Sequence, residues 1–343
     1  MYREKTIGVV IPAYNEVGLV GDVIESLPSF VDRVYVIDDC STDGTWAEIR
    51  TAAAAVNGRV SDHSQQKAYA DGGRRYDPTV VTTRHSENLG VGGAIKTGYR
   101  QARDDDLDVV AVVNGDGQMD PAILDRIVDP VVDGWADYAK GDRLSRRTLR
   151  EEMSTWRLFG NTVLTFLTKT VSGYWRMTDP QNGYTAISAH ALETIDIDRL
   201  YDDFGFCNDL LVHLNVHDMR IADVEMESKY RDETSHIAYS SFVPKLSWLL
   251  LKRALWRWKT KYVVADFHPL VFLYLLGFVG AGVGVTALGW ALVSAGMGVI
   301  TGLLSVIVVM LGGLFVVLAM IFDRTESAEL ERHVEQRVRE GNE

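Results

Sequence analysis

The sequence is poor in cysteine: Cys40 and Cys207 are the only two in 343 residues. Two cysteines give no disulfide framework, so we expect a protein of a reducing compartment. Basic residues are also scarce relative to acidic ones, with 35 Lys and Arg against 47 Asp and Glu and a formal net charge of −12. This charge argues against a protein that coats nucleic acid, and we expect no nucleic-acid partner.

Charged residues are missing altogether from one long run. Between Phe267 and Phe322 there is no Asp, Glu, Lys or Arg. The run has room for two membrane-spanning helices of about 20 residues each. We place them near Leu270–Val293 and Val299–Phe322, with a turn at 294–298. A helical hairpin in a soluble core is the alternative, but an uncharged, glycine-rich run of this length favours the membrane.

Acidic residues are missing just before this run. From Thr234 to Ala265 the chain has six Lys and Arg, interleaved with tryptophan, and no Asp or Glu. A nucleic-acid patch is one interpretation, but the position favours a helix in the membrane interface, with basic side chains on anionic lipid. Because basic flanks face the cytosol and two spans return the chain to the same side, we expect both termini and the globular part to be cytosolic. We expect no signal or transit peptide.

The composition outside the apolar run is that of a globular protein. We expect a globular domain over residues 1–240, an interfacial helix over 241–266, two membrane helices over 267–322 and an exposed, helical, mixed-charge tail over 323–343. The sequence leaves the oligomeric state open.

Within the globular part, short β-branched runs alternate with amphipathic stretches. We expect strands near Thr6–Pro12, Arg33–Ile37, Thr79–Thr83 and Asp108–Val113. The alternation predicts an α/β fold with a doubly wound, mostly parallel sheet. Residues 57–77 are polar and glycine-rich, so we expect a surface insertion there.

Polar residues follow each of these strands. They are Tyr14 and Glu16 after the first, Asp38 and Asp39 after the second, Asn88 and Gly90 after the third, and Asp116 and Gln118 after the fourth. Ordinary turns would explain any one cluster, but ligands bind at the carboxyl ends of parallel strands, and the coincidence favours a site. These residues suit a nucleotide sugar. Carboxylates can accept hydrogen bonds from a base or from ribose hydroxyls, and a glycine-rich helix N-terminus can face phosphate. Asp116 and Gln118 can carry Mg²⁺ or Mn²⁺.

Four segments in this order resemble family 2 glycosyltransferases with the GT-A fold. They are PAYNE from Pro12, DDCSTDGT from Asp38, NLGVGGAIKTGY from Asn88 and NGDGQMDP from Asn114. The chain resembles in particular dolichyl-phosphate mannose and glucose synthases and related polyprenyl-phosphate hexosyltransferases, over about residues 5–261. Each segment alone is a weak signal, whereas the ordered set is specific. The resemblance implies a Rossmann-like sheet of the GT-A type.

The resemblance also implies a donor site. Its nucleotide-sugar ligands would be Pro12, Tyr14, Glu16, Asp38, Asp39, Asn88, Gly90, Lys96 and Asn114, with Asp38 in a supporting role. Asp116 and Gln118 match the metal-binding members of a D-x-D-x-Q motif. Asn114 stands where the family usually has Asp, which removes one negative charge from the site.

Acceptor residues follow from the same resemblance. Arg143 matches an arginine that faces the acceptor phosphate, and Arg157 and Asn161 match positions near the lipid phosphate. Arginine suits this task because its planar fork gives a phosphate two hydrogen bonds. Arg157 and Asn161 fall in a helix that we expect over Leu149–Val171, either a core helix or one in the membrane interface. Ser235 matches the serine of an R-x-x-G-x-S loop.

Two further carboxylates are candidates for catalysis. Asp179 begins a segment that resembles the lining of the family's sugar pocket, with a structural turn as the alternative. Asp209 lies where many relatives carry an acidic base, although the local match is loose. His213 and His217 have a spacing that zinc sites use, but without a third ligand we expect a satisfied pair on a helix surface.

We expect a membrane hexosyltransferase that moves a sugar from a nucleotide donor to a polyprenyl (dolichyl-type) phosphate at the cytosolic face, for protein or surface glycosylation. Such an acceptor is already ionised and needs no base. One alternative is a transferase that elongates a lipid-linked or polymeric glycan, where Asp209 or Asp179 would serve as base. Another is a non-catalytic scaffold of the same fold, suggested only by Asn114. The sequence leaves the hexose and the nucleotide open.

Overall fold

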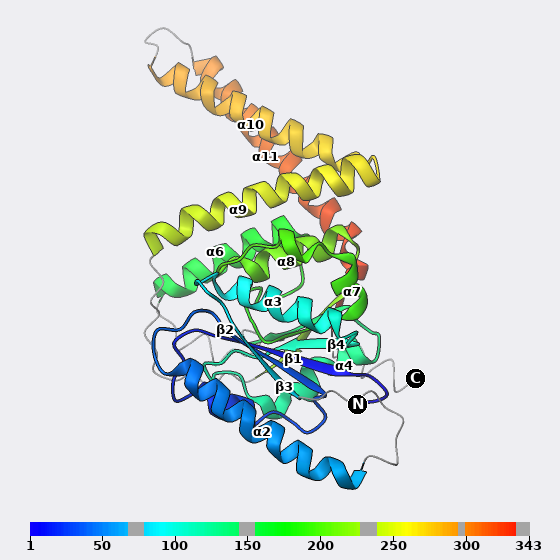
Figure 1. The fold of residues 1–343 in the computed structure, drawn as a ribbon. Coiled ribbons are helices and arrows are strands. Elements are labelled where there is room, and N and C mark those ends of the chain that lie inside the picture. The colour runs from blue at the N-terminus through cyan, green and yellow to red at the C-terminus, as the bar shows by residue number, and fades with distance from the viewer. Residues whose placement is uncertain (68–78, 144–154, 227–238, 294–298, 334–343) are drawn as a thin grey trace.

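A computed structural model of the chain describes residues 1–67, 79–143, 155–226, 239–293 and 299–333. The described part is a sheet covered by helices on both faces, from which two long helices project (Figure 1). The strands are β1 Ile7–Ala13, β2 Arg33–Asp38, β3 Val80–Arg84, β4 Val109–Val112, β5 Tyr138–Asp142, β6 Thr185–Ser188, β7 Ile221–Glu225 and β8 Glu331–His333.

The sheet is mixed but mostly parallel. Its strand order is β3-β2-β1-β4-β6-β5-β7-β8. Among the described strands, only β6 runs antiparallel to its neighbours, β4 and β5. The carboxyl ends of β1 to β5 and β7 therefore meet at one edge, together with the start of β6. The predicted doubly wound α/β sheet is confirmed.

Helices cover the sheet in layers. They are α1 Val20–Glu25, α2 Thr45–Lys67, α3 Val91–Asp104, α4 Leu124–Val132, α6 Thr155–Ser172, α7 Ala189–Thr194, α8 Phe206–Val216, α9 Tyr239–Lys259, α10 Leu270–Val293 and α11 Val299–Glu326. Helices α1, α2 and α4 pack on one face and α3, α7 and α8 on the other. Helices α6 and α9 form a further layer over α8.

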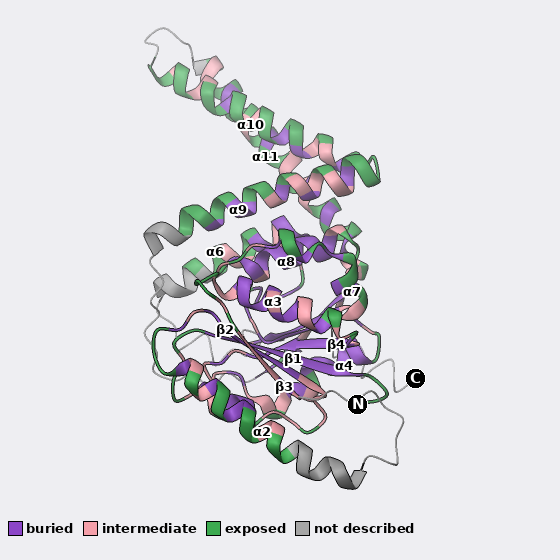
Figure 2. Ribbon diagram, viewed as in Figure 1, coloured by how far each residue is buried: buried purple, intermediate pink, exposed green. Residues whose placement is uncertain are grey.

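The strands owe their burial to the two-residue period of their side chains. Val9 and Ile11 of β1 face the core under α1 and α2, whereas Val10 faces the core under α3. Every residue of β1 is buried, as expected for a central strand of a sheet covered on both faces. Figure 2 shows this buried centre and the largely exposed hairpin of α10 and α11.

Helices α10 and α11 fall where the uncharged run predicts two spans. Both are long and apolar enough to cross a membrane. Only 22% and 17% of their most apolar windows are buried within the protein, unlike the hairpin of a soluble core. The predicted pair of apolar helices is confirmed.

Two expectations about local structure are wrong. Helix α2 continues to Lys67, where we expected an insertion to begin at Asn57. The Asn57 side chain bonds the backbone N–H and C=O of Val80, so this part of the helix is tied to β3. The described part of the tail, residues 323–333, is not an exposed helix: after α11 it forms a short 3₁₀ turn and then β8, at the edge of the sheet. Residues 68–78 and 334–343 lie outside the described part.

Candidate active site

The end of β2 is anchored by a buried carboxylate. Asp38 is fully buried; its Oδ1 accepts a hydrogen bond from the Ser41 backbone N–H at 3.3 Å, and its Oδ2 lies 2.9 Å from Nε of Arg84. Arg84 ends β3 and remains 42% exposed. Asp38 therefore holds two neighbouring strand ends together, and its supporting role in nucleoside binding stays a prediction.

Asp39 organises the loop that leads into α3. Its Oδ1 accepts from the backbone N–H of Leu89 at 2.9 Å and lies 2.7 Å from Nδ1 of His85. Its Oδ2 accepts from the N–H of Gly90 at 2.8 Å. These contacts shape the wall of the site, and a nucleoside contact for Asp39 stays a prediction.

The loop after β1 leaves an aromatic ring at the surface. Pro12 is buried within β1, whereas Tyr14 is 44% exposed. Asn15 between Tyr14 and Glu16 has a positive φ of 56°, and its Oδ1 accepts from the Thr42 N–H at 2.9 Å. The loops after β1 and β2 are thus tied together beside the predicted nucleoside residues.

The glycine-rich start of α3 has a packing role that we did not predict. A Cβ on Gly90 would lie 2.6 Å from the Asp202 carbonyl oxygen, and one on Gly92 would lie 2.5 Å from that of Tyr201. The N–H of Gly93 donates to the Asp202 carbonyl at 2.9 Å. These glycines let the backbone approach a neighbouring loop closely. The predicted phosphate contact at Gly90 has no support from this geometry.

Lys96 and Asn88 are likewise engaged within the protein. The buried ammonium of Lys96 donates to the Leu200 carbonyl at 2.9 Å and to the Asp202 carboxylate at 2.7 Å. The exposed Asn88 accepts from the Gly90 N–H at 3.1 Å. For Lys96 the structure therefore indicates an anchor for the loop before α8, and donor binding stays a prediction.

The end of β4 forms a tight, partly exposed turn. The N–H of Gln118 donates to Oδ1 of Asp116 at 2.9 Å, and Gly117 has a φ of 68°. The N–H of Gly115 donates to the Pro12 carbonyl at 3.1 Å, which presses the turn against β1. Asn114 lies beside Gly183, whose Cβ, if it had one, would be 3.6 Å from the Asn114 amide.

The turn has a donor set that suits a hard cation. Within the described residues there is no group of three or more His, Cys, Asp and Glu that could hold a metal. Mg²⁺ and Mn²⁺ sites at nucleotides need no such group, since one or two protein oxygens and the substrate phosphates complete the shell. The carboxylate of Asp116 and the amide of Gln118, both partly exposed, fit that pattern.

On the acceptor side the structure brings two predicted residues together. Arg143 donates from Nε to Oδ2 of Asp179 at 2.7 Å and from Nη2 to Oδ1 at 3.2 Å. Asp179 is buried, whereas the Arg143 side chain is 35% exposed. Buried Lys140 donates to the Asp179 carbonyl at 3.0 Å and pairs with Asp223 at 2.8 Å. The guanidinium is thus fixed by a fork-to-fork pair and still reaches the surface.

Asp209 lies in α8 and contacts α9. It is buried; its Oδ2 accepts from Arg253 of α9 and from the Tyr201 N–H, both at 2.8 Å. Burial raises the pKa of Asp209, and the pairing with Arg253 opposes this. These contacts hold α9 against α8, so the base role of Asp209 stays a prediction without geometric support.

His213 contradicts the expected surface pair. It is buried and packs against Trp256 in a tilted arrangement, with ring centroids 4.5 Å apart, and burial lowers its pKa to about 3. His217 is exposed at the C-cap of the same helix. A neutral imidazole wedged between helices is a core residue, and this pair does not form a zinc site.

Three predicted acceptor residues lie beyond what the structure describes. Arg157 and Asn161 fall within α6, but their side chains are outside the described part, as is all of Ser235. Sequence reasoning in turn missed His85, Arg84, Lys140 and Asp223. Each of them lies in or just after a strand that ends at the site edge, and this placement is the signal that could have found them.

Comparisons with known proteins agree with this architecture. Residues 8–196 match the model of glycosyl transferase family 2. The chain therefore belongs to that family and is a glycosyltransferase with the GT-A fold. It has the same fold as glucosyl-3-phosphoglycerate synthase from Mycobacterium tuberculosis in complex with UDP, with a TM-score of 0.51 and 20% identity, over 73% of this chain and 80% of that one.

Three curated relatives show which kinds of glycosyltransferase the chain is similar to. A UDP-N-acetylglucosamine–dolichyl-phosphate N-acetylglucosaminyltransferase of Methanococcus voltae is 26% identical over 67% of this chain and 88% of the relative. An undecaprenyl-phosphate mannosyltransferase of Micrococcus luteus is 29% identical over 63% and 80%. A polyprenol monophosphomannose synthase of Mycolicibacterium smegmatis is 30% identical over 58% and 67%. The names of all three refer to transfer of a sugar to a polyprenol or its phosphate.

Proposed function

We propose that this glycosyltransferase moves a hexose from a nucleotide sugar to a polyprenyl (dolichyl-type) phosphate at the cytosolic face of a membrane. The observation that carries the proposal is the Arg143 guanidinium, fixed by Asp179 and partly exposed at the sheet edge that also bears Asp116. The names of the relatives support the same acceptor class. Protein or surface glycosylation is the role that such a product would serve.

On the donor side, Tyr14, Glu16 and Asp39 would contact the nucleoside, with Asp38 holding the strand ends behind them. Asp116 and Gln118 would hold Mg²⁺ or Mn²⁺, which when bound would neutralise charge on the leaving diphosphate. Asn114, beside Gly183, offers an amide where a carboxylate would add charge. The protein's task at this end is to hold the donor in one orientation.

On the acceptor side, the phosphate is already ionised at neutral pH, so the reaction needs no general base. The contacts of the two candidate bases agree with a reaction that needs no base, since Asp179 is paired with Arg143 and Asp209 with Arg253. The fork of Arg143 would orient the phosphate for attack on the anomeric carbon. A glycan-elongating enzyme would need a carboxylate able to take a proton, and both candidates are bound to arginine.

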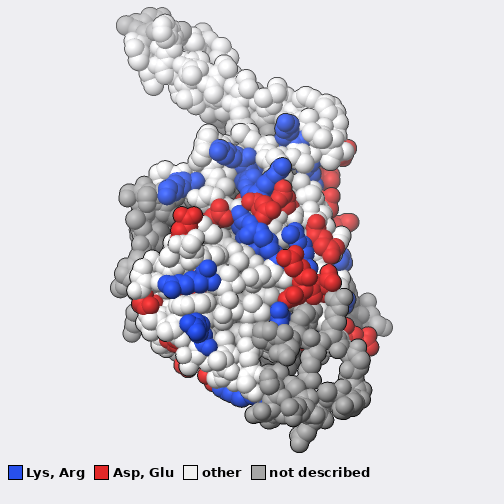
Figure 3. All heavy atoms as spheres, viewed as in Figure 1, with Lys and Arg blue, Asp and Glu red and all other residues white. Residues whose placement is uncertain are grey.

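The membrane face of the domain would be the layer of α6 and α9. It exposes apolar side chains, among them Phe166 and Leu167 of α6 and Trp248, Leu251 and Leu255 of α9. The Lys252 ammonium lies 5.2 Å from the Trp248 ring centroid, a pairing suited to headgroup depth. Figure 3 shows the projecting part of the hairpin without charged side chains, and Lys and Arg below it together with Asp and Glu.

This placement orients the chain. Basic residues of α9 before α10 would keep the domain in the cytosol, and α11 would return the chain there. Residues 294–298, outside the described part, would connect the spans on the opposite side. The N-terminus and the tail would both be cytosolic.

The test is transfer by the purified full-length protein in nanodiscs, with labelled UDP- and GDP-hexoses and either a polyprenyl phosphate or a lipid-linked glycan as acceptor. We expect label on the polyprenyl phosphate. Arg143→Ala should raise the KM for that acceptor by roughly tenfold or more, because a charge-assisted hydrogen bond contributes about 1.5–3 kcal/mol. The KM for the donor should stay near the wild-type value.

Arg143→Lys should recover only part of the loss, because a point charge cannot replace the planar fork. Arg103→Ala is the matched control, since Arg103 is exposed at the end of α3. Label on the lipid-linked glycan alone would support the elongating transferase. Absence of transfer with every donor would support the scaffold.

A further inference from the structure

The chain after the second apolar helix folds back onto the catalytic domain. Strand β8 pairs in parallel with β7, with Glu331 opposite Ile221 and His333 opposite Asp223. We refer to residues 323–333 as the C-terminal strap. The strap closes the sheet edge next to β7, which pairs with β5 on the acceptor side of the site.

Glu331 of the strap holds a segment that has no regular structure. Its Oε1 accepts from the backbone N–H of Trp175 at 2.9 Å, and its Oε2 accepts from those of Arg176 and Met177 at 2.6 and 2.8 Å. The next N–H, of Thr178, donates to Asp223 at 2.8 Å. Two carboxylates thus satisfy four consecutive backbone donors that would otherwise be buried unpaired or open to water.

The segment held in this way ends at the acceptor pair. Asp179 follows Thr178 directly and grips the guanidinium of Arg143. Lys140 joins the two supports, because it donates to the Asp179 carbonyl and pairs with Asp223. A continuous series of contacts therefore runs from Glu331 to Arg143.

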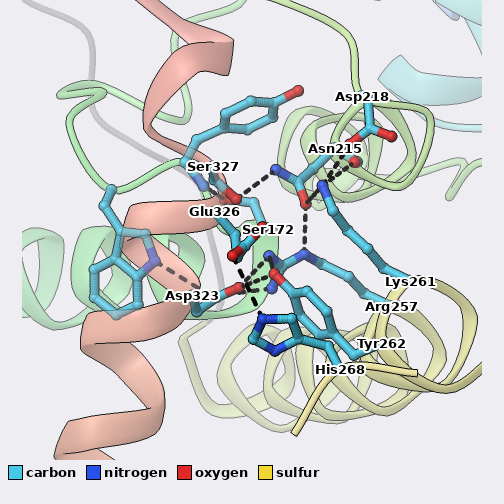
Figure 4. A network of polar contacts seen from close by, with 12 residues as sticks. Ser172, Asn215, Asp218, Arg257, Lys261, Tyr262, His268, Asp323, Glu326 and Ser327 are labelled. Atoms are coloured by element: carbon cyan, nitrogen blue, oxygen red, sulfur yellow. Dashed lines mark hydrogen bonds and ion pairs between the residues drawn. The ribbon is translucent and has the colours of Figure 1, made fainter. Parts of the chain in front are cut away.

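The other end of the strap is bound to the base of the hairpin. Asp323 is buried at the end of α11 and accepts from Arg257 at 2.6 Å, from the Tyr262 hydroxyl and from Nε1 of Trp175 at 3.2 Å (Figure 4). Trp175 is thus held twice, by its backbone N–H and by its indole. The strap connects the membrane hairpin to the same segment that ends at Asp179.

We propose that the C-terminal strap positions the acceptor phosphate site: Glu331 fixes the Trp175–Asp179 segment, and through it the orientation of Arg143 relative to the membrane. Glu331 is a positioning residue, since it acts through Asp179. The proposal rests on the proposed function for the meaning of Arg143. The contacts themselves stand without it.

The first test compares Glu331→Gln with Glu329→Gln in the full-length protein in nanodiscs. Both changes remove one carboxylate, but Glu329 is exposed. In Glu331→Gln, the NH₂ of the new side-chain amide would face a backbone N–H donor, so part of the segment should loosen. We expect the KM for polyprenyl phosphate to rise roughly tenfold in Glu331→Gln, with the donor KM unchanged, and no change in Glu329→Gln.

A second comparison separates positioning from general stability. In an Arg143→Ala background, Glu331→Gln should add little, because residues that act through one another are not additive. Trp175→Phe removes the indole donor to Asp323 and some ring volume but keeps the backbone N–H bond to Glu331, so it serves as a milder variant and should show the same KM split with a smaller rise. Parallel losses with donor and acceptor, or full additivity with Arg143→Ala, would overturn the proposal.

Amide hydrogen exchange makes the test independent of the proposed function. Glu331→Gln should speed exchange at residues 175–178, whereas Glu329→Gln should not. If the wild-type protein transfers nothing to polyprenyl phosphate, the proposed function fails. The exchange result still shows whether Glu331 of the strap fixes residues 175–178. Unchanged exchange at 175–178 in Glu331→Gln would refute the strap even in an active enzyme.

Discussion

Aspartate–arginine pairs occur in two regions of the molecule with different surroundings. At the site edge, the arginine of each pair is partly open: Arg84 is 42% exposed beside Asp38, and Arg143 is 35% exposed beside Asp179. At the base of the hairpin, Arg257 and Asp323 are both fully buried. The arginine side chains of the edge pairs keep part of their surface in solvent, whereas both side chains of the hairpin pair lie wholly inside the protein.

The buried pair is stabilised by more than its mutual attraction. Taking two charges out of water costs several kcal/mol per ion unless other hydrogen bonds complete their shells. Here Asn215 accepts from Nε of Arg257 at 2.6 Å, and Tyr262 and Trp175 donate to Asp323. Gly173 makes room for the guanidinium, since a Cβ there would lie 2.0 Å from Nη2. The geometry indicates a specific joint between α8, α9 and α11.

The largest expected effect lies at the site edge. Asp116→Ala should abolish transfer, a loss on the order of 10²–10³-fold or more, because it removes the one carboxylate that we place on the cation. Asn114→Asp should keep or raise activity and strengthen metal binding, because it adds a carboxylate beside that cation. Stability should change little, since Asp116 lies on a partly exposed turn.

Transfer assays with and without Mg²⁺, together with thermal unfolding, make this measurement. Full activity of Asp116→Ala in excess chelator would refute the metal assignment. A large loss of stability in the same variant would show that the site edge also stabilises the fold. The site edge and the hairpin base would then not differ in role.

The opposite pattern is expected at the hairpin base. Asp323→Asn leaves the buried Arg257 without its counter-charge, which should destabilise the protein by about 3–5 kcal/mol. Asp266→Asn is the matched control, because Asp266 is exposed close to the same joint and should change stability by less than about 0.5 kcal/mol. Chemical unfolding in a fixed detergent measures both.

A double-mutant cycle with Arg257→Met tests whether the pair acts as a unit. We expect a coupling energy of about 0.5–3 kcal/mol between the two positions. Purely additive effects would mean that the joint depends on packing around the pair and that the ion pair contributes little.

The same contrast explains what the sequence could predict. The site edge can be predicted from short stretches of sequence. Asp38 and Asp116 each follow an apolar run, and the parallel sheet brings the carboxyl ends of these strands together. This pattern predicted the fold and the edge. Arg143 and Asp179 became candidates only through the resemblance to family 2 glycosyltransferases, and the sequence did not predict that they pair. It did not reveal that the Gly90 loop packs on Asp202, because that contact depends on a loop more than 100 residues away.

The joint at the base of the hairpin cannot be predicted from short stretches of sequence. Arg257 belongs to a basic run typical of an interfacial helix, and Asp323 begins a mixed-charge segment typical of an exposed tail. Only the fold shows that they meet, 66 residues apart in the chain. Glu331 is a similar case, since nothing around it in the sequence indicates that it accepts from Trp175.

The smallest expected effect tests how far this specific packing extends into the hairpin. The sequence predicted two spans rich in glycine but not which glycines face inward. In α11, a Cβ on Gly312 would lie 2.5 Å from the Ala281 backbone nitrogen and 2.8 Å from the Gly277 carbonyl oxygen of α10. A Cβ on the neighbouring Gly313 would meet no atom within 4 Å. Close backbone approach at small residues is the usual basis of helix packing in membranes.

Gly312→Ala and Gly313→Ala therefore form a pair that differs only in which face of α11 receives one methyl group. Gly312→Ala should force the helices apart and destabilise the hairpin by about 1–3 kcal/mol, as overpacking does elsewhere. Gly313→Ala should be neutral or slightly stabilising, because alanine is the better helix former. Thermal unfolding in one detergent, at one protein concentration, compares them. If the two variants unfold alike, the inward glycines do not set the hairpin geometry, and the rigid region ends at Asp323; if only Gly312→Ala is weakened, specific packing continues from the joint into the apolar helices.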